Sequence, residues 1–242
     1  WAQCSGSTSH IGEINVLNNI KLNLSELFKL MKLSEANYGS IERRSLVRSL
    51  DVIYDMLIRY PRVYALRIDL RFAIESPPDD LDTLLCQQRS DPRAITRFFE
   101  SLKEQLRADH IRNNRRGEPE LPAYIWCRER DTSVHSHYHV VLLFNKDVYA
   151  FLGNYQRCDA DNMGVRLQKA WCSALALPYP DYAHLVEFPE NHNCWFTRND
   201  AILKKNDYLG FLFRIAYLSK QEGKISDDYR NFGTSQVHSL GR

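Results

Sequence analysis

The stretch Ser133–Asn145, SVHSHYHVVLLFN, decides the fold, and it carries three histidines at alternate positions. His135, His137 and His139 lead directly into the apolar run 140–144, which is rich in β-forming residues and predicts a strand. Residues i, i+2 and i+4 of a strand share one face, so the three imidazoles are expected side by side. Neutral imidazole is the commonest protein metal ligand. The stretch therefore predicts either a metal site or a histidine-bearing strand end without a metal.

Length and composition are those of an ordinary globular protein. The 242 residues suit one large domain, or a domain with a helical extension, and 44% hydrophobic with 26% charged residues is typical. The net charge of +2 permits a nucleic-acid partner without indicating one. Six scattered cysteines without a Cys-x-x-Cys argue against a disulfide scaffold and a thiolate zinc site. No apolar run reaches about 18 residues and no signal peptide is evident, so a cytoplasmic protein with no membrane partner is expected.

Periodicity along the chain predicts a mixed α+β fold. Helices are expected over 22–33, 41–60, 93–112, 164–175 and 202–220, and strands over 63–72, 123–130, 183–188, 194–196 and the histidine stretch. The order strand–helix–strand–strand–helix–strand is that of a split βαβ, ferredoxin- or RRM-like fold. Residues 62–242 are thus expected to form one domain with a central antiparallel sheet, helices on one face and the histidines on the open face. Residues 1–61 are expected to form an N-terminal helical extension that packs onto it.

A carboxylate is expected beside the histidines. Glu129 lies eight residues before His137, and the short polar turn 131–134 predicts an antiparallel hairpin that brings the two together. One carboxylate and two imidazoles suit Mg²⁺ or Mn²⁺. His135 is the competing third ligand and would make an all-imidazole site. A cross-strand ion pair with a neighbouring arginine is the alternative role for Glu129.

A candidate nucleophile lies near the end of the last long predicted helix. Tyr217 and Lys220 are three residues apart and share a helix face. A tyrosine hydroxyl, with a pKa of about 10, is a poor nucleophile unless a cation, a base or a metal assists it. Lys220 supplies positive charge. Taken alone, a Tyr-x-x-Lys is common and is typical of an amphipathic surface.

Taken together, these elements resemble the HUH endonucleases, the replication initiators and relaxases that nick single-stranded DNA. That superfamily's signature is a His–hydrophobe–His on a strand and a later Tyr-x-x-Lys on a helix. Within it, the chain is most similar to the inovirus-type rolling-circle replication initiators of filamentous phages and integrated elements. The segments that look similar are 67–71, 124–129, 137–145, 216–220 and 231–235.

The resemblance implies a mechanism and partners. His137, His139 and a third ligand would hold the metal, and Tyr217 would attack the scissile phosphate to give a 5′-phosphotyrosine and a free 3′-OH. Lys220 would stabilise charge or position the phosphate. Tyr208 lies about two and a half helical turns earlier, on the opposite side, so a single-tyrosine enzyme is expected. The implied partners are single-stranded or origin-hairpin DNA, together with a host helicase and polymerase, during replication of a phage or mobile element in a bacterial cytoplasm.

DNA contacts are expected from basic residues near the predicted sheet. The candidates are Arg67, Arg71, Arg112, Arg115, Arg116, Lys204 and Lys205, with Arg43, Arg44 and Arg48 on the N-terminal helices as a further group. Trp126, Tyr138 and Trp195 could stack on bases or pack in the core.

Other His-x-His enzymes fit the sequence less well. A JAMM-type zinc isopeptidase requires Ser and Asp where Asn145 and Val148 stand. A two-histidine phosphodiesterase needs two separate His-x-Ser/Thr elements, and a cupin needs a Glu shortly after the pair. Two alternatives stay open. A relaxase-type mobilisation protein would share the chemistry, and a non-catalytic DNA-binding protein on the same fold would need no Tyr217.

Overall fold

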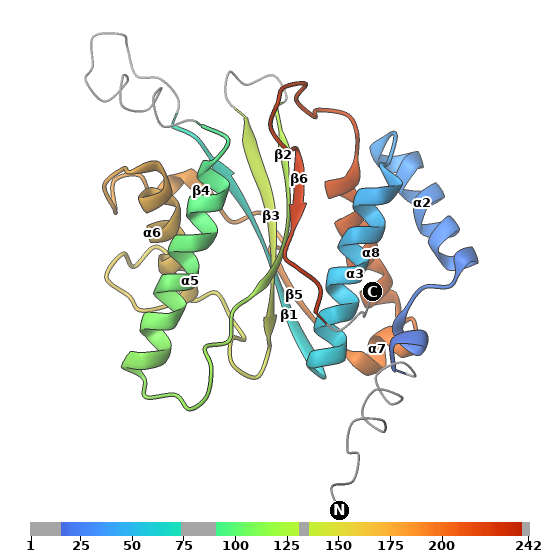
Figure 1. The fold of residues 1–242 in the computed structure, drawn as a ribbon, viewed down its shortest axis with the longest axis horizontal. Coiled ribbons are helices and arrows are strands. Elements are labelled where there is room, and N and C mark those ends of the chain that lie inside the picture. The colour runs from blue at the N-terminus through green and yellow to red at the C-terminus, as the bar shows by residue number, and fades with distance from the viewer. Residues whose placement is uncertain (1–15, 74–90, 131–135, 239–242) are drawn as a thin grey trace, which may run out of the picture.

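The computed structural model describes residues 16–73, 91–130 and 136–238, which build a six-stranded antiparallel sheet with helices on both faces (Figure 1). The helices are α2 (Leu24–Tyr38), α3 (Arg43–Arg59), α5 (Ala94–Arg112), α6 (Met163–Leu175), α7 (Arg198–Ile202) and α8 (Asn206–Ala216). The strands are β1 (Arg62–Arg71), β2 (Ala123–Glu129), β3 (His137–Asn145), β4 (Val186–Glu187), β5 (Asn193–Thr197) and β6 (Phe232–Thr234). The predicted mixed α+β class with a central antiparallel sheet is confirmed.

The histidine strand β3 is the central strand of this sheet. The strand order is β4-β1-β3-β2-β6, and β5 also pairs with β1. β3 pairs with β1 along its whole length, from Val63 opposite Asn145 to Arg71 opposite His137. Every residue of the apolar run 140–144 is buried. This run reads as continuously hydrophobic, and not alternating, because both of its faces are covered.

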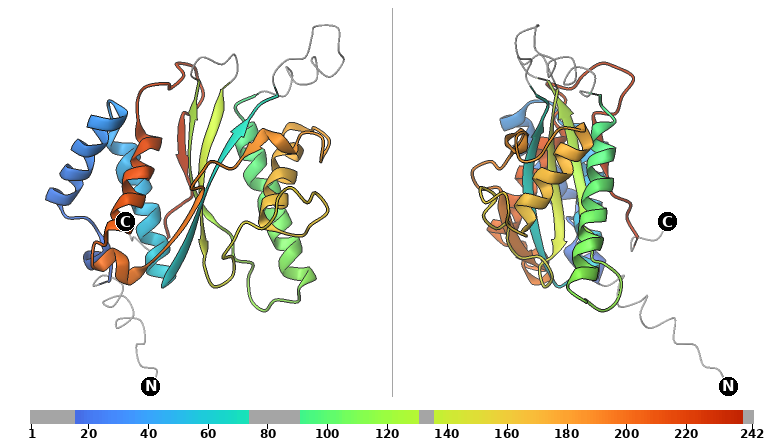
Figure 2. Two further views of the ribbon diagram at one scale, coloured as in Figure 1. Left: turned by 180° about the vertical axis from the view of Figure 1, so that it is seen from behind. Right: turned by 90° about the vertical axis from the view of Figure 1, so that its left-hand side faces the viewer.

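The two faces of the sheet carry separate hydrophobic cores. Even-numbered residues of β1 and β3 pack with α5 and α6, around the fully buried Trp171. Odd-numbered residues of the same strands belong to a second core with α3 and α8, which includes Val141, Leu50 and Phe211. Figures 1 and 2 show these helix pairs on opposite sides of the sheet. The prediction that helices cover one face and leave the histidine face open is therefore wrong, because α3 and α8 cover most of that face.

The two N-terminal helices pack in different places: α3 packs against the sheet, and α2 packs against α8 on its outer side (Figure 1). Asn23 caps α2 through a capping box with Glu26, which satisfies backbone N–H groups at the helix start. The next helix, α3, has one of the most strongly amphipathic patterns in the chain and buries Leu46, Ile53 and Leu57 completely. Its residues share a core with β1, β2 and β3.

The predicted helix over 202–220 is wrong at both ends. A capping box of Thr197 with Asp200 starts the short helix α7, and the chain then turns at Lys204, whose φ is +49°. The Lys204 ammonium donates to the backbone carbonyls of residues 19, 20 and 21 at 2.9–3.2 Å, which fixes this turn against the N-terminal segment. The second helix, α8, ends at Ala216, and Tyr217–Ser219 form a 3-10 turn, η2.

Two further segments differ from their predictions. The expected strand over 183–188 is a 3-10 turn, Ala183–Leu185, followed by the two-residue strand β4. The polar tail, for which no pattern was found, contributes β6, an edge strand that pairs with β2. Three residues are too few for an alternating pattern to stand out from a polar segment.

Glycine-to-alanine substitutions at two positions are expected to have opposite effects. A Cβ at Gly233 would lie 2.6 Å from the ring of the buried Trp126, so Gly233→Ala should destabilise the protein by about 1–3 kcal/mol. A Cβ at Gly210, on the exposed face of α8, would meet nothing within 4 Å. Gly210→Ala should stabilise the protein by about 0.5–1 kcal/mol. Urea unfolding measures both, and equal effects at the two positions would contradict the packing described.

Within the described residues, the structure contains no helix whose length and apolar character would let it span a bilayer.

Candidate metal centre and tyrosine

Strand pairing brings the polar side chains of three strands into two adjacent rows on the face shared with α8. In one row Asp69 of β1, His139 of β3 and Cys127 of β2 stand opposite one another. In the next row His137 stands between Arg71 and Glu129. Directly paired residues of antiparallel strands share a face, so the predicted hairpin places Glu129 beside both histidines, as expected from its spacing.

The two histidines and Glu129 form a compact donor set. The Nε2 atoms of His137 and His139 are 3.1 Å apart, and a Glu129 carboxylate oxygen is 3.5 Å from Nε2 of His139. One ligand atom from each residue lies within 4.8 Å of the others. Two ligands bound to one ion at about 2.1 Å in adjacent octahedral positions are about 3.0 Å apart. The three residues can therefore hold one divalent ion.

Asp69 fixes the orientation of the His139 ring. The Asp69 carboxylate lies 2.7 Å from Nδ1 of His139 and is an acceptor when ionised, so Nδ1 carries the proton and Nε2 points toward the donor set. Burial alone would lower the pKa of His139, but the hydrogen bonds to Asp69 and Glu129 outweigh it and the pKa is raised. Metal binding at Nε2 would displace a proton there.

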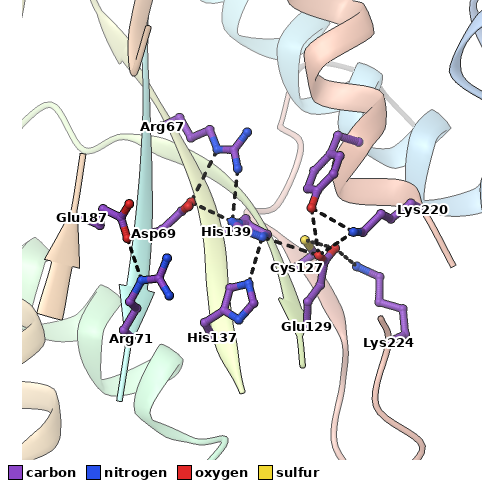
Figure 3. Close-up of polar contacts among 11 residues, drawn as sticks. Arg67, Asp69, Arg71, Cys127, Glu129, His137, His139, Glu187, Lys220 and Lys224 are labelled. Carbon is purple, nitrogen blue, oxygen red and sulfur yellow. Dashed lines mark hydrogen bonds and ion pairs between the residues drawn. The ribbon is translucent and has the colours of Figure 1, made fainter. Parts of the chain in front are cut away.

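The Glu129 carboxylate is completely buried and surrounded by cations. Lys220 lies 3.1 Å from one of its oxygens, and Lys224 lies 3.2 Å from the other (Figure 3). Burial would raise the pKa of Glu129, but the hydrogen bond to His139 and the charge of Lys224 hold it far below its ordinary value. The carboxylate is thus ionised at neutral pH, as a metal ligand must be.

Tyr217 comes to this cluster from a distant part of the sequence. Its hydroxyl lies 3.2 Å from Glu129 Oε2 and accepts a hydrogen bond from Lys220 Nζ at 2.9 Å. The aromatic ring packs edge-on against His139, at 5.5 Å, and against Tyr38 of α2, at 5.4 Å. The predicted pair Tyr217 and Lys220 does share one surface, although both residues lie beyond the end of α8.

The local charges leave Tyr217 protonated in this arrangement. Burial raises the pKa of its hydroxyl, the hydrogen bond from Lys220 lowers it, and the charge of Glu129 raises it again, so the net change is upward. Cationic groups also lie over the ring, with Lys220 Nζ at 4.4 Å and the Arg67 guanidinium at 5.5 Å from its centroid. A metal cation bound between Tyr217 and Glu129 would offset the negative charge of Glu129, which is one of the causes of the raised tyrosine pKa.

Lys224, Asp69 and Tyr38 contribute to the site, and sequence patterns did not assign them to it. The Lys224 ammonium binds both Glu129 and the backbone carbonyl of Leu218, 3.3 Å away, which ties the tyrosine turn to the carboxylate. Asp69 was recognisable as a polar residue within a strand, on the same face as its neighbouring arginines. The other two carry no local signal, because their contacts depend on chain segments that are far apart in sequence.

Two other predicted residues have clear outcomes. His135, the competing third ligand, lies outside the described residues. Tyr208 is buried in the core against Phe196 and Phe211, and its hydroxyl has no hydrogen-bond partner within the described structure. Its ring lies in the core, whereas the ring of Tyr217 packs against His139.

The basic residues expected to contact DNA lie in different places. Arg67 contacts His139 and Asp69 at the site, and Arg71 pairs with Glu187 beside it.

Arg115 binds Asp109 and Tyr149 past the far end of β3, about 26 Å along the strand from His137. Arg112 pairs with Asp109 as well and with Asp161, and Arg116 is exposed. Lys204 and Lys205 precede α8, about 18 Å along it from Tyr217, and Lys205 pairs with Asp200.

Asp69→Asn is expected to weaken metal binding by about 10- to 100-fold, because the amide no longer fixes the His139 ring with Nε2 unprotonated. Titration calorimetry with Mn²⁺ measures the change. Glu187→Gln is the matched control: this carboxylate pairs with Arg71 on the neighbouring strand and is half-exposed. Equal affinity of Asp69→Asn and the unmodified protein would show that His139 is not a ligand.

The fold and the site define the chain as an α+β protein whose central antiparallel sheet carries a His/His/Glu cluster with metal-ligand geometry next to a tyrosine and two lysines. The chain belongs to the family described as YagK/YfjJ C-terminal domain, whose family model matches residues 24–235. It is 39% identical over 183 residues to the uncharacterized protein YagK of Escherichia coli strain K12, covering 74% of this chain and 86% of YagK. It is 32% identical over 208 residues to the uncharacterized protein YfjJ of the same strain, covering 84% of this chain and 98% of YfjJ. No solved structure matches the chain.

Proposed function

We propose that the protein is a metal-dependent HUH-type endonuclease that nicks and joins single-stranded DNA through a 5′-phosphotyrosine at Tyr217. The observation that carries the proposal is the distance of 3.2 Å between the Tyr217 hydroxyl and Glu129, the carboxylate that faces both histidines. Tyr217 and Glu129 are 88 residues apart in the sequence. Their contact therefore comes from the tertiary fold and not from the spacing of residues along one helix.

The chain topology supports the finer fold assignment. The strand order β4-β1-β3-β2, with α5 between β1 and β2 and α6 between β3 and β4, is the order expected of a split βαβ fold. Helices α5 and α6 share one face. Helix α8 covers the other face, where the histidines are, and the turn directly after it carries Tyr217.

The chemistry of the donor set fits a small divalent ion. His137, His139 and Glu129 would hold Mg²⁺ or Mn²⁺, and the bound ion would neutralise charge on the scissile phosphate. Lys220 and Lys224 already balance the charge of the buried Glu129, which keeps the site assembled.

The residues around Tyr217 suit a transesterification. The tyrosine oxygen would form a bond to phosphorus and give up its proton to water, while the bond from phosphorus to the 3′ oxygen breaks and the leaving oxygen takes up a proton from water to become the free 3′-OH. Lys220, which donates to the tyrosine oxygen at 2.9 Å, would stabilise that oxygen as it loses its proton. Reversal of the same step by the 3′-OH of another strand end would join DNA and release Tyr217.

The surroundings offer an approach for DNA. Helix α3 starts beside the tyrosine turn, where Ile41 pairs with Lys220 and the Glu42 amide donates to the Ser219 carbonyl at 2.8 Å. The exposed residues Arg43, Arg44 and Arg48 follow on α3, where Arg48 donates to Thr234 at 3.2 Å. Exposed arginines on this helix can neutralise the phosphates of an incoming strand. Replication initiation in a bacterial cytoplasm, with a helicase and polymerase, would use the free 3′-OH; mobilisation by a relaxase would use the same chemistry.

The test is incubation of the protein with a set of labelled single-stranded oligonucleotides and Mn²⁺, followed by denaturing gel electrophoresis. We expect a shortened DNA strand and a protein band shifted by covalently attached DNA, both lost with EDTA. Binding of the oligonucleotides without an adduct under Mg²⁺ or Mn²⁺ would favour the non-catalytic DNA-binding alternative and overturn the proposal.

A further inference from the structure

Two lysines bind the carboxylate that a metal ion in the donor set would use. Glu129 is the single carboxylate of that set, and an ammonium group lies against each of its oxygens (Figure 3). Lys220 Nζ is 3.1 Å from Oε2, the same oxygen that lies 3.5 Å from Nε2 of His139. Lys224 Nζ is 3.2 Å from Oε1. An ion bound to His139 and Oε2 would therefore share that oxygen with the Lys220 ammonium.

The side chains in contact with the donor set carry an excess of positive charge. Arg67 adds a third cation to the two lysines, because its guanidinium lies 3.3 Å from Nδ1 of His139. These three cations face two carboxylates, Glu129 and Asp69. With neutral imidazoles, the excess among these described residues is one positive charge, and a divalent ion would raise it to three. Coulomb repulsion then opposes metal binding.

Burial keeps this repulsion from being screened. The Glu129 side chain is 0% exposed, and the side chains of Lys220 and Lys224 are 14% and 19% exposed. Salt and water screen partly buried charges much less than surface charges. Both ammonium groups are also held by a second acceptor, since Lys220 donates to the Tyr217 hydroxyl at 2.9 Å and Lys224 to the Leu218 carbonyl at 3.3 Å. The lysines are thus fixed beside the place where an ion would bind.

We propose that Lys220 and Lys224 make metal binding at the donor set depend on a bound phosphodiester. The inference rests on the proposed function, which brings a phosphodiester of single-stranded DNA to Tyr217. An anion at the tyrosine oxygen would meet Lys220 and lie near Arg67, whose guanidinium is 5.5 Å from the centroid of the same ring. The anion would offset part of the excess charge, so the ion and the phosphodiester strengthen each other's binding by the same factor. The protein would then bind its metal tightly only when DNA is present.

The test measures Mn²⁺ affinity without any DNA cleavage. Wild-type protein, Lys220→Met and Lys224→Met are titrated with Mn²⁺, and free Mn²⁺ is followed by electron paramagnetic resonance. Each titration is run with dimethyl phosphate, a phosphodiester without a base, and again with sodium chloride at equal ionic strength. Methionine keeps an apolar stem and removes the charge, and thermal melts verify folding. Lys103→Met is the matched control, because Lys103 pairs with Glu100 on α5, which packs on the opposite face of the sheet.

We expect dimethyl phosphate to raise the Mn²⁺ affinity of the wild-type and control proteins by about tenfold or more over chloride. In chloride, each of the variants Lys220→Met and Lys224→Met should bind Mn²⁺ about tenfold more tightly than the wild-type protein, and dimethyl phosphate should add about twofold or less. If one of these variants does not fold, the other decides the result.

Equal wild-type affinity in dimethyl phosphate and chloride would overturn the inference, as would folded lysine variants that bind Mn²⁺ no better than the wild-type protein. The readout is binding and needs no attack by Tyr217. Coupled binding without nicking would therefore contradict the proposed function and support the inference, whereas nicking without coupled binding would overturn the inference alone.

Discussion

Tyr217→Phe is expected to lower the rate of DNA cleavage by more than about a thousandfold and to remove the covalent protein–DNA adduct, because phenylalanine has no oxygen to attack phosphorus. The substitution keeps the ring contacts with His139 and Tyr38, so the fold and the donor set should persist. Cleavage of a labelled oligonucleotide in Mn²⁺, followed on a denaturing gel, measures the rate.

Tyr208→Phe is the matched control for this experiment. Tyr208 lies within α8 and Tyr217 directly follows that helix, but the Tyr208 hydroxyl is buried without a hydrogen-bond partner in the described structure. Removing an unsatisfied buried hydroxyl should leave stability equal or slightly higher. Full activity of Tyr208→Phe together with loss in Tyr217→Phe identifies the nucleophile; residual cleavage by Tyr217→Phe near the wild-type rate would mean that another group attacks.

The second large effect is expected at the histidines. Mn²⁺ at a hundred times its dissociation constant should raise the free energy of unfolding of the wild-type protein by about 2.7 kcal/mol. His137→Ala removes one ligand of three and should abolish most of this increase. His137 is only half-buried, so the substitution leaves the core intact. Urea unfolding with and without Mn²⁺ measures the difference.

His184→Ala controls for general histidine binding of the metal. His184 is exposed in the 3-10 turn before β4, where its ring contacts the Asp181 carbonyl. The metal-dependent increase should persist in this variant. If Mn²⁺ stabilises His137→Ala as much as the wild-type protein, the ion binds elsewhere and the donor set has another role.

The parts of the site that sequence analysis predicted depend on local rules. Period-two spacing places His137 and His139 on one face of a strand. The hairpin pairing of β2 with β3 places Glu129 directly opposite His137. Hairpin register follows from a few neighbouring residues, so the contact could be inferred. The approach of Tyr217 could not be derived from periodicity; it was expected only from the resemblance to a family.

The remaining features depend on tertiary structure. Lys224 follows the tyrosine turn in a segment without a repeating pattern, and its contact with Glu129 exists because that segment passes β2 before forming β6. The helical conformation is interrupted before α8 at Lys204, which has a positive φ. There the hydrogen bonds from the lysine side chain to backbone carbonyls of a distant segment outweigh the local preference for a helix. The packing of α3 over the histidine face of the sheet could not be predicted either. An amphipathic pattern shows that a helix buries one face, but it does not show which element that face packs against.

Mass spectrometry of the trapped protein–DNA complex tests the central claim most directly. The wild-type protein is incubated with a single-stranded oligonucleotide and Mn²⁺, and the adduct is digested with nuclease and protease. The account predicts a nucleotide attached through its 5′ phosphate to the peptide that contains Tyr217. An adduct on any other residue, or cleaved DNA that carries no protein at its 5′ end, would contradict it.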